Sequence, residues 1–146
     1  MRTLKRLVLF TEILLCLAWA RFLVRFVAFS RWRHLLGPID APPDTPEQLD
    51  AARTRHARNI GRRIDQVAGR VPFQAVCLPR AMAGKWILAR RGIPSHVVLG
   101  SRRGDADEAD MMFHAWLVAG DTVVTGAGQL ERYGAFAKKR TGDNAA

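Results

Sequence analysis

The chain has 146 residues, of which 49% are hydrophobic and 25% charged, and this composition excludes a chain that is disordered throughout. The length allows one domain with a modest core and an extension. Its 23 Lys and Arg against 13 Asp and Glu give a net charge of +10, which favours an acidic partner such as nucleic acid, an anionic membrane surface or an acidic peptide. Two cysteines are too few for a disulfide framework, and no zinc motif is present. We therefore expect a reduced, cytoplasmic protein without a cofactor or metal.

A basic amphipathic helix is predicted to take up most of residues 1–37 and to end at Gly37-Pro38. Its basic start, apolar stretch and small residues resemble a secretory signal peptide. However, Glu12 interrupts the apolar stretch, which is shorter than the ~20 residues that a membrane-spanning helix needs. Arg21 and Arg25 lie one turn apart on a single face. The pattern favours a helix that packs on the domain or on a partner. Membrane-surface contact is the second interpretation and a cleaved signal the third.

Residues 38–69 are expected to form a connector rich in Pro and Asp, followed by an arginine-rich helix. Asp44 or Thr45 is the candidate N-cap, so the helix would begin near Pro46 and end at Ala68. Such a run of arginines is typical of a solvated face, and a docking site is the second interpretation. The arginines concerned are Arg53, Arg55, Arg58, Arg62 and Arg63.

Residues 70–140 are predicted to hold a third helix and then a small antiparallel sheet. The helix is expected over residues 77–91, with Gly92 as a left-handed cap. Alternating and β-branched residues predict three strands, over 95–101, 111–118 and 122–126, the last two joined by a tight turn. A charged loop precedes the second strand, a short helix is expected over 130–139, and residues 141–146 form a flexible tail. Helices followed by a sheet make an α+β fold.

Cys77 and His114 are the candidate catalytic pair. A thiol is an effective nucleophile only as the thiolate, and both a helix N-terminus and a nearby imidazolium favour that anion. Cys77 precedes Leu78-Pro79-Arg80, a sequence that suits the first turn of a helix. His114 lies in the middle of a predicted strand, FHAWLV. The two residues alone leave a structural role open. Their order, cysteine first and histidine on a later strand, is that of papain-like and transglutaminase-like enzymes.

Four passages together resemble the transglutaminase-like leader peptidases of lasso peptide biosynthesis, the protease half of the B protein that matures microcin-type lasso peptides. They are Cys77-Leu-Pro-Arg-Ala-Met-Ala, Leu88-Ala-Arg-Arg-Gly-Ile-Pro, Val97-Val-Leu-Gly and His114-Ala-Trp-Leu, within residues 72–133. The resemblance implies a cysteine protease core that cuts the leader from a ribosomally made lasso precursor. It also implies two partners, a small leader-binding protein and an asparagine-synthetase-like cyclase, and no nucleic acid.

The resemblance implies that Cys77 attacks the scissile carbonyl. It also implies that His114 takes the thiol proton and gives it to the leaving amine. The backbone N–H of Cys77 helps to hold the oxyanion, with Gln74 as a candidate second donor. The family's acid lies on the strand after the histidine strand, where this chain has Thr125-Gly126 and no carboxylate. Asp121 is the nearest acid and the candidate third member of a Cys-His-Asp triad, although a turn favours Asp for its geometry alone. A Cys–His dyad is the alternative.

Two other functions stay open at this point. A transglutaminase-fold acyltransferase would use the same cysteine and histidine and differ only in the acceptor of the acyl group. A non-catalytic basic module could instead bind nucleic acid or membrane through the N-terminal helix and the arginine-rich helix.

Overall fold

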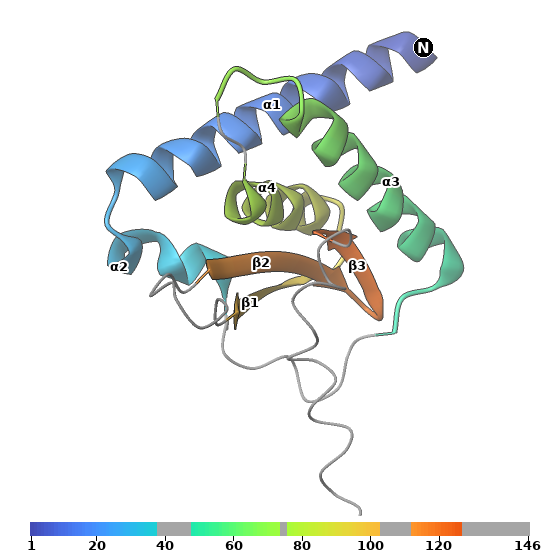
Figure 1. Cartoon of the computed structure of the whole chain (residues 1–146). Helices are drawn as coiled ribbons and strands as arrows, with labels where there is room; N and C mark the ends of the chain where they lie inside the picture. The colour runs from blue at the N-terminus through green and yellow to red at the C-terminus, as the bar shows by residue number, and fades with distance from the viewer. Residues whose placement is uncertain (38–47, 74–75, 103–111, 127–146) are drawn as a thin grey trace, which may run out of the picture.

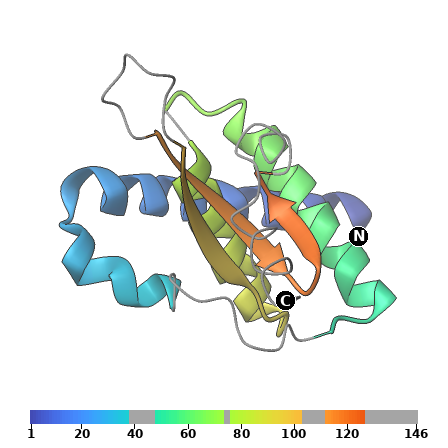
Figure 2. The same cartoon turned by 60° about the horizontal axis from the view of Figure 1, so that its bottom comes forward.

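The computed structural model describes residues 1–37, 48–73, 76–102 and 112–126. Helices come first in the chain and a three-stranded antiparallel sheet follows, which confirms the predicted α+β class. The helix α4 (Cys77–Arg90) lies between the sheet and α1 (Arg2–Phe26), and α3 (Ala51–Ala68) packs beside α4 on the same side of the sheet (Figure 1). Figure 2 looks onto the other side of the sheet, with α1 and α4 behind it.

The N-terminal helix is shorter than predicted. It ends at Phe26, and the backbone of the next residue, Val27, is extended with φ −115° and ψ 135°. A short helix α2 (Phe29–Trp32) and a 3₁₀ helix η1 (Arg33–Leu36) follow. The side chain of Trp32 is buried, and its Nε1 donates a hydrogen bond to the carbonyl of Val27 at 3.1 Å. The prediction of one helix over most of residues 1–37 is therefore wrong, because the buried indole folds the chain back against the end of α1.

One face of α1 belongs to the core of the domain. Ile13, Leu17 and Ala20 are fully buried on this face, against α4 and α3. Glu12, which interrupts the apolar stretch, binds the end of α4 through Arg91 Nη2 at 2.6 Å and Arg90 Nη2 at 3.0 Å. The hydrogen bond from Arg91 is the largest cause that lowers the pKa of Glu12 below its ordinary value. The prediction that this helix packs on the domain is confirmed, and the three predicted segments share one core.

The arginine-rich helix α3 begins at Ala51, later than the predicted Pro46. Asp50 is its N-cap, and the Asp50 carboxylate accepts a hydrogen bond from the backbone N–H of Arg53 at 2.8 Å. The two predicted caps lie outside the described residues. The arginine side chains of α3 are exposed, as expected of a solvated face: Arg53, Arg55, Arg58, Arg62 and Arg63.

The predicted order of α4 and the strands is confirmed, with bounds that differ by about one residue. Gly92 follows α4 with the left-handed φ of 66° that was expected of a cap. The strands are β1 (His96–Arg102), β2 (Met112–Ala119) and β3 (Thr122–Thr125), and β2 lies in the middle. Gly120, with φ 57°, makes the turn between β2 and β3. The predicted short helix over 130–139, the flexible tail over 141–146 and most of the charged loop lie outside the described residues.

Candidate active site

Cys77 is the first residue of α4, and its thiol is half-buried. The N-cap residue is Val76, whose apolar side chain makes no capping hydrogen bond. The third residue of the helix, Pro79, has no N–H to satisfy. The first N–H groups of a helix carry partial positive charge, and they favour an anion placed beside them. The sequence therefore puts the thiol of Cys77 beside the N–H groups at the start of α4.

Arg80 stands one turn into α4 and is paired with an acid of α3. Its Nη1 lies 3.3 Å from Oδ1 of Asp65. Burial raises the pKa of Asp65, and the charge of Arg80 partly offsets this effect. The Asp65 carboxylate thus balances part of the positive charge that Arg80 brings to the first turn of α4. No sequence pattern indicated that Asp65 of α3 would lie beside Arg80 of α4.

His114 is the third residue of β2, and its side chain is only 4% exposed. Its ring meets the indole of Trp116 edge to face, with 4.7 Å between the ring centroids. A Cβ atom at Gly126 would lie 3.2 Å from His114 Nε2 and 2.9 Å from Trp116 Cδ1. Gly126 also has a left-handed φ of 87°. A residue without a side chain is therefore needed at the end of β3 to leave space for the two rings.

Burial lowers the pKa of His114 below its ordinary value, and a hydrogen bond with the backbone of Gly126 partly offsets this effect. A lowered pKa keeps the imidazole neutral near neutral pH. The neutral ring has one nitrogen that accepts a proton, so it is in the protonation state that a general base requires.

Cys77 and His114 lie at the same end of the layer formed by α4 and the sheet. Since β1 runs back along α4 and pairs antiparallel with β2, α4 and β2 run in the same direction (Figures 1 and 2). The two elements touch where a Cβ at Gly84 would lie 2.5 Å from Leu117 Cδ2. Cys77 precedes Gly84 by two helical turns, about 10 Å, and His114 precedes Leu117 by about 10 Å of strand.

The sheet narrows beside His114. Alternation along β2 puts His114 and Trp116 on the face opposite to Leu117. Laterally, β3 pairs with the edge of β2 that β1 does not occupy. The last residue of β3, Thr125, pairs with Leu117. Within the described residues, the part of β2 that holds His114 therefore has no partner in β3. His114 lies next to Gly126, at the end of the layer where α4 begins, and its ring is on the face of β2 opposite to Leu117, the residue that contacts Gly84 of α4.

The structure does not bring Asp121 to His114. Asp121 is exposed in the turn that follows β2. Because a strand rises ~3.3 Å per residue, the end of β2 lies about 16 Å from His114. Gln74, the candidate second oxyanion donor, lies outside the described residues.

Thr125 is a polar residue of this region whose role the sequence did not indicate. Its side chain is 1% exposed, and within the described residues its Oγ1 has no hydrogen-bond partner. It is the last residue of β3, in the neighbourhood where the resemblance leads one to expect an acid. The Thr125 side chain is buried close to Gly84 of α4, where a Cβ on Gly84 would lie 3.7 Å from Thr125 Cγ2.

The shifted pKa of His114 predicts an acid-dependent loss of stability. The folded pKa lies below the ordinary value of 6.5, so the unfolded chain binds this proton more readily. The stability from the neutral imidazole is therefore complete above pH 6.5 and is lost as the pH falls toward the folded pKa. Urea unfolding between about pH 5 and pH 8 should show a smaller loss on acidification in His114→Gln than in the wild type.

A matched control for this measurement is His56→Gln, which changes an exposed histidine of α3. It should lose stability on acidification as the wild type does. Burial also lowers the pKa of His96, so His114→Gln should retain part of the pH dependence. An unchanged pH dependence in His114→Gln would contradict the environment described for His114.

Comparison with known proteins identifies the family of the chain. A family model described as the Transglutaminase-like superfamily matches residues 19–138. No curated protein and no solved structure matches the chain. The matched segment contains the end of α1, the helix that begins with Cys77, and the strand that carries His114. Because this match covers most of the chain, the protein belongs to the transglutaminase-like superfamily.

Proposed function

We propose that this protein is a cysteine peptidase that removes the leader from a ribosomally made lasso peptide precursor. One observation carries the proposal. The half-buried thiol of Cys77, at the N-terminus of α4, and the buried imidazole of His114, in β2, lie at the same end of the layer formed by α4 and the sheet. The lasso substrate rests on the resemblance of the passages around Cys77 and His114. The leader-binding protein and the asparagine-synthetase-like cyclase are proposed as partners on the same basis, in the cytoplasm.

In the first half of the proposed reaction, the His114 imidazole takes the proton from Cys77 Sγ. The thiolate then forms a bond to the scissile carbonyl carbon, and the oxygen gains the negative charge. The backbone N–H of Cys77 and the side chain of Gln74 are the proposed donors to this oxyanion. When the C–N bond breaks, the imidazolium gives its proton to the leaving amine and leaves a thioester on Cys77.

In the second half, His114 takes a proton from a water molecule, which attacks the thioester and releases the leader with a free carboxyl end. The proton then returns to the Cys77 sulfur, which leaves as a thiol. The position of Asp121 in the turn beyond the end of β2 favours a Cys–His dyad over a triad that includes Asp121. We assign the orientation of the imidazole to the backbone of Gly126 and the ring of Trp116.

Mass spectrometry of the products tests this proposal against the acyltransferase alternative. A candidate precursor, made with its leader, is incubated with the protein and the leader-binding protein, with and without an added primary amine. We expect two fragments whose masses sum to the precursor plus one water, in both mixtures. A product that carries the amine, with no hydrolysed leader, would favour the acyltransferase. An intact precursor in every mixture would contradict both functions.

A further inference from the structure

The helix α1 has a second apolar face, which the domain leaves exposed. We call it the α1 stripe. Its side chains are between 45% and 70% exposed. They recur at the spacing of a single helical face, and they lie away from the buried side chains of Ile13 and Leu17. The α1 stripe consists of Leu4, Leu7, Val8, Leu15, Trp19, Phe22 and Phe26.

The α1 stripe is apolar apart from the indole N–H of Trp19. None of its residues is charged. Thr11, which lies on the same face, donates its hydroxyl to the carbonyl of Leu7 at 3.0 Å, so its polar hydrogen is satisfied within the helix and the face stays apolar. The end of the stripe is aromatic: the ring of Phe22 lies 5.5 Å from that of Trp19 and 5.4 Å from that of Phe26. Such amphipathic and aromatic side chains are typical of the boundary between lipid and water.

Cations flank this apolar face. Lys5 stands on one side of it, and Arg21 and Arg25 stand on the other, with the guanidinium of Arg25 5.5 Å from the centroid of Phe26. The whole chain carries a net charge of +10. A second copy of the chain would bring like charges together, whereas a surface of anionic lipids would complement them.

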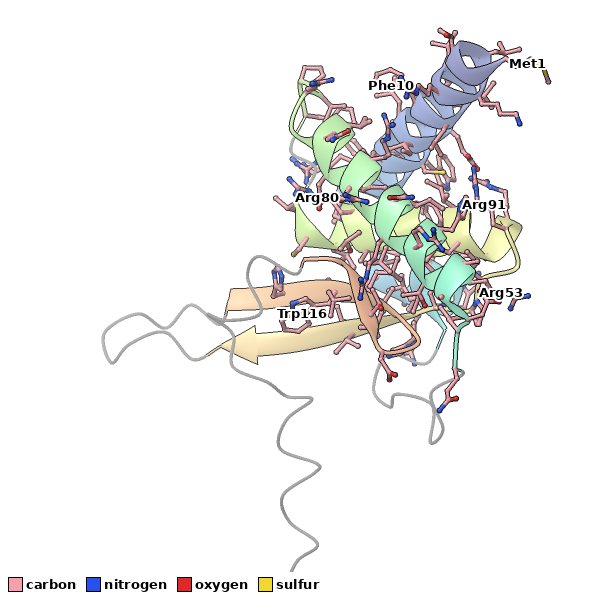
Figure 3. The ribbon with its side chains drawn as sticks, turned by 90° about the vertical axis from the view of Figure 1, so that its right-hand side faces the viewer. Met1, Phe10, Arg53, Arg80, Arg91 and Trp116 are labelled. Carbon is pink, nitrogen blue, oxygen red and sulfur yellow. The ribbon has the colours of Figure 1, made fainter. Side chains whose placement is uncertain are left out.

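Thr3–Phe26 is long and apolar enough to cross a membrane by length and composition, and an 18-residue window within it has a mean hydropathy of 2.1. Its other face, however, packs on α3 and α4, and Glu12 pairs with Arg90 and Arg91. Figure 3 shows α1 lying across the helical side of the domain, with its Met1 end beyond the other helices. A helix held in this way presents its free face to a surface rather than passing through it.

We propose that the α1 stripe docks this protein onto an anionic bilayer, with α1 lying in the plane of the lipid headgroups. The apolar side chains enter the boundary of the acyl chains, and Lys5, Arg21 and Arg25 contact the phosphates. This places the domain on the membrane surface without a spanning segment. The proposal is independent of the peptidase function, because no residue of the α1 stripe belongs to the candidate site.

Vesicle flotation with the full chain tests the docking. One set of vesicles contains phosphatidylcholine alone, and a second contains phosphatidylcholine with phosphatidylglycerol. We expect binding to the mixed vesicles, weakened by added salt. The double variant Val8→Asp/Leu15→Asp, which places two carboxylates two turns apart on the stripe, should bind at least about tenfold less. Both positions are mostly exposed, so circular dichroism should show an unchanged fold.

Two control variants make the result specific. Ala52→Asp/Asn59→Asp adds the same charge at exposed positions of α3, and it should bind much better than the stripe variant. Val8→Leu/Leu15→Met keeps the stripe apolar and should bind as the wild type does. Absence of binding to the mixed vesicles, equal binding by the stripe variant, or resistance of bound protein to alkaline carbonate would overturn the proposal. So would a dimer, seen by sedimentation without vesicles, that the stripe variant breaks.

Discussion

Replacing Cys77 with alanine is expected to lower the rate of precursor cleavage by at least about a thousandfold. The proposed acyl intermediate needs the sulfur of Cys77, and no neighbouring side chain can form the same thioester. The side chain is small and only half-buried, so its removal should leave the fold intact. Product formation is measured by mass spectrometry, and the fold is checked by circular dichroism and urea unfolding.

The other cysteine provides the control for this experiment. Cys16 lies on the buried face of α1, 8% exposed, and its sulfur is 3.2 Å from Arg90 Nη2. Cys16→Ala should therefore lower stability somewhat and leave the cleavage rate close to that of the wild type. The rate of alkylation near neutral pH should likewise depend on Cys77 and not on Cys16. Cleavage at the wild-type rate by Cys77→Ala would show that the nucleophile is another residue.

Gly61→Ala is expected to destabilise the protein by about 1–3 kcal/mol or more, as overpacking does at a close contact. A Cβ at Gly61 would overlap the backbone carbonyl oxygen of Val124. Backbone cannot rotate away as a long side chain can, so α3 would have to move off β3. The free energy of unfolding in urea measures the effect, since α3 and β3 belong to one core.

Gly69 is the matched position at the end of the same helix. It has φ −74°, an ordinary helical value, and a Cβ there would be no closer than 3.5 Å to the chain. Gly69→Ala should therefore be neutral or slightly stabilising, because alanine restricts the unfolded chain. Equal losses in the two variants would mean that helix geometry, and not the contact with Val124, determines the cost at Gly61.

The order and type of the elements could be predicted because local signals agree with the tertiary structure in most of the chain. Gly92 after α4 and Gly120 in the hairpin turn are such signals, since their left-handed backbone requires glycine. The break after Phe26 could not be predicted in this way. It depends on the burial of Trp32 and on its hydrogen bond to the carbonyl of Val27, just after α1, a contact that leaves no periodic trace in the sequence. The prediction of Pro46 as the helix start favoured the first plausible cap, whereas Asp50 makes the capping bond.

In the candidate site too, residues marked by local signals could be predicted, and residues that matter through tertiary packing could not. Cys77 and His114 were identifiable because a helix start and a strand position are local properties, and the resemblance linked them. The resemblance pointed to Thr125 and Gly126 only as the place where a carboxylate is missing, and their packing against α4 and the two rings could not be predicted from the sequence. Asp121 was selected by its distance in sequence. The extended strand between it and His114 turns a short sequence interval into a long distance in space.

The double role of α1 has a practical consequence for protein production. A strategy that trims residues 1–26 as if they were a removable signal would also strip Ile13, Leu17 and Ala20 from the core and leave α4 uncovered. The shortened polypeptide would lose the α1 stripe, but it would expose the apolar side of α4 that α1 covers. Mild detergent or lipid nanodiscs, used with the full chain, would shield the apolar side of α1 and keep the scaffold beneath Cys77 intact.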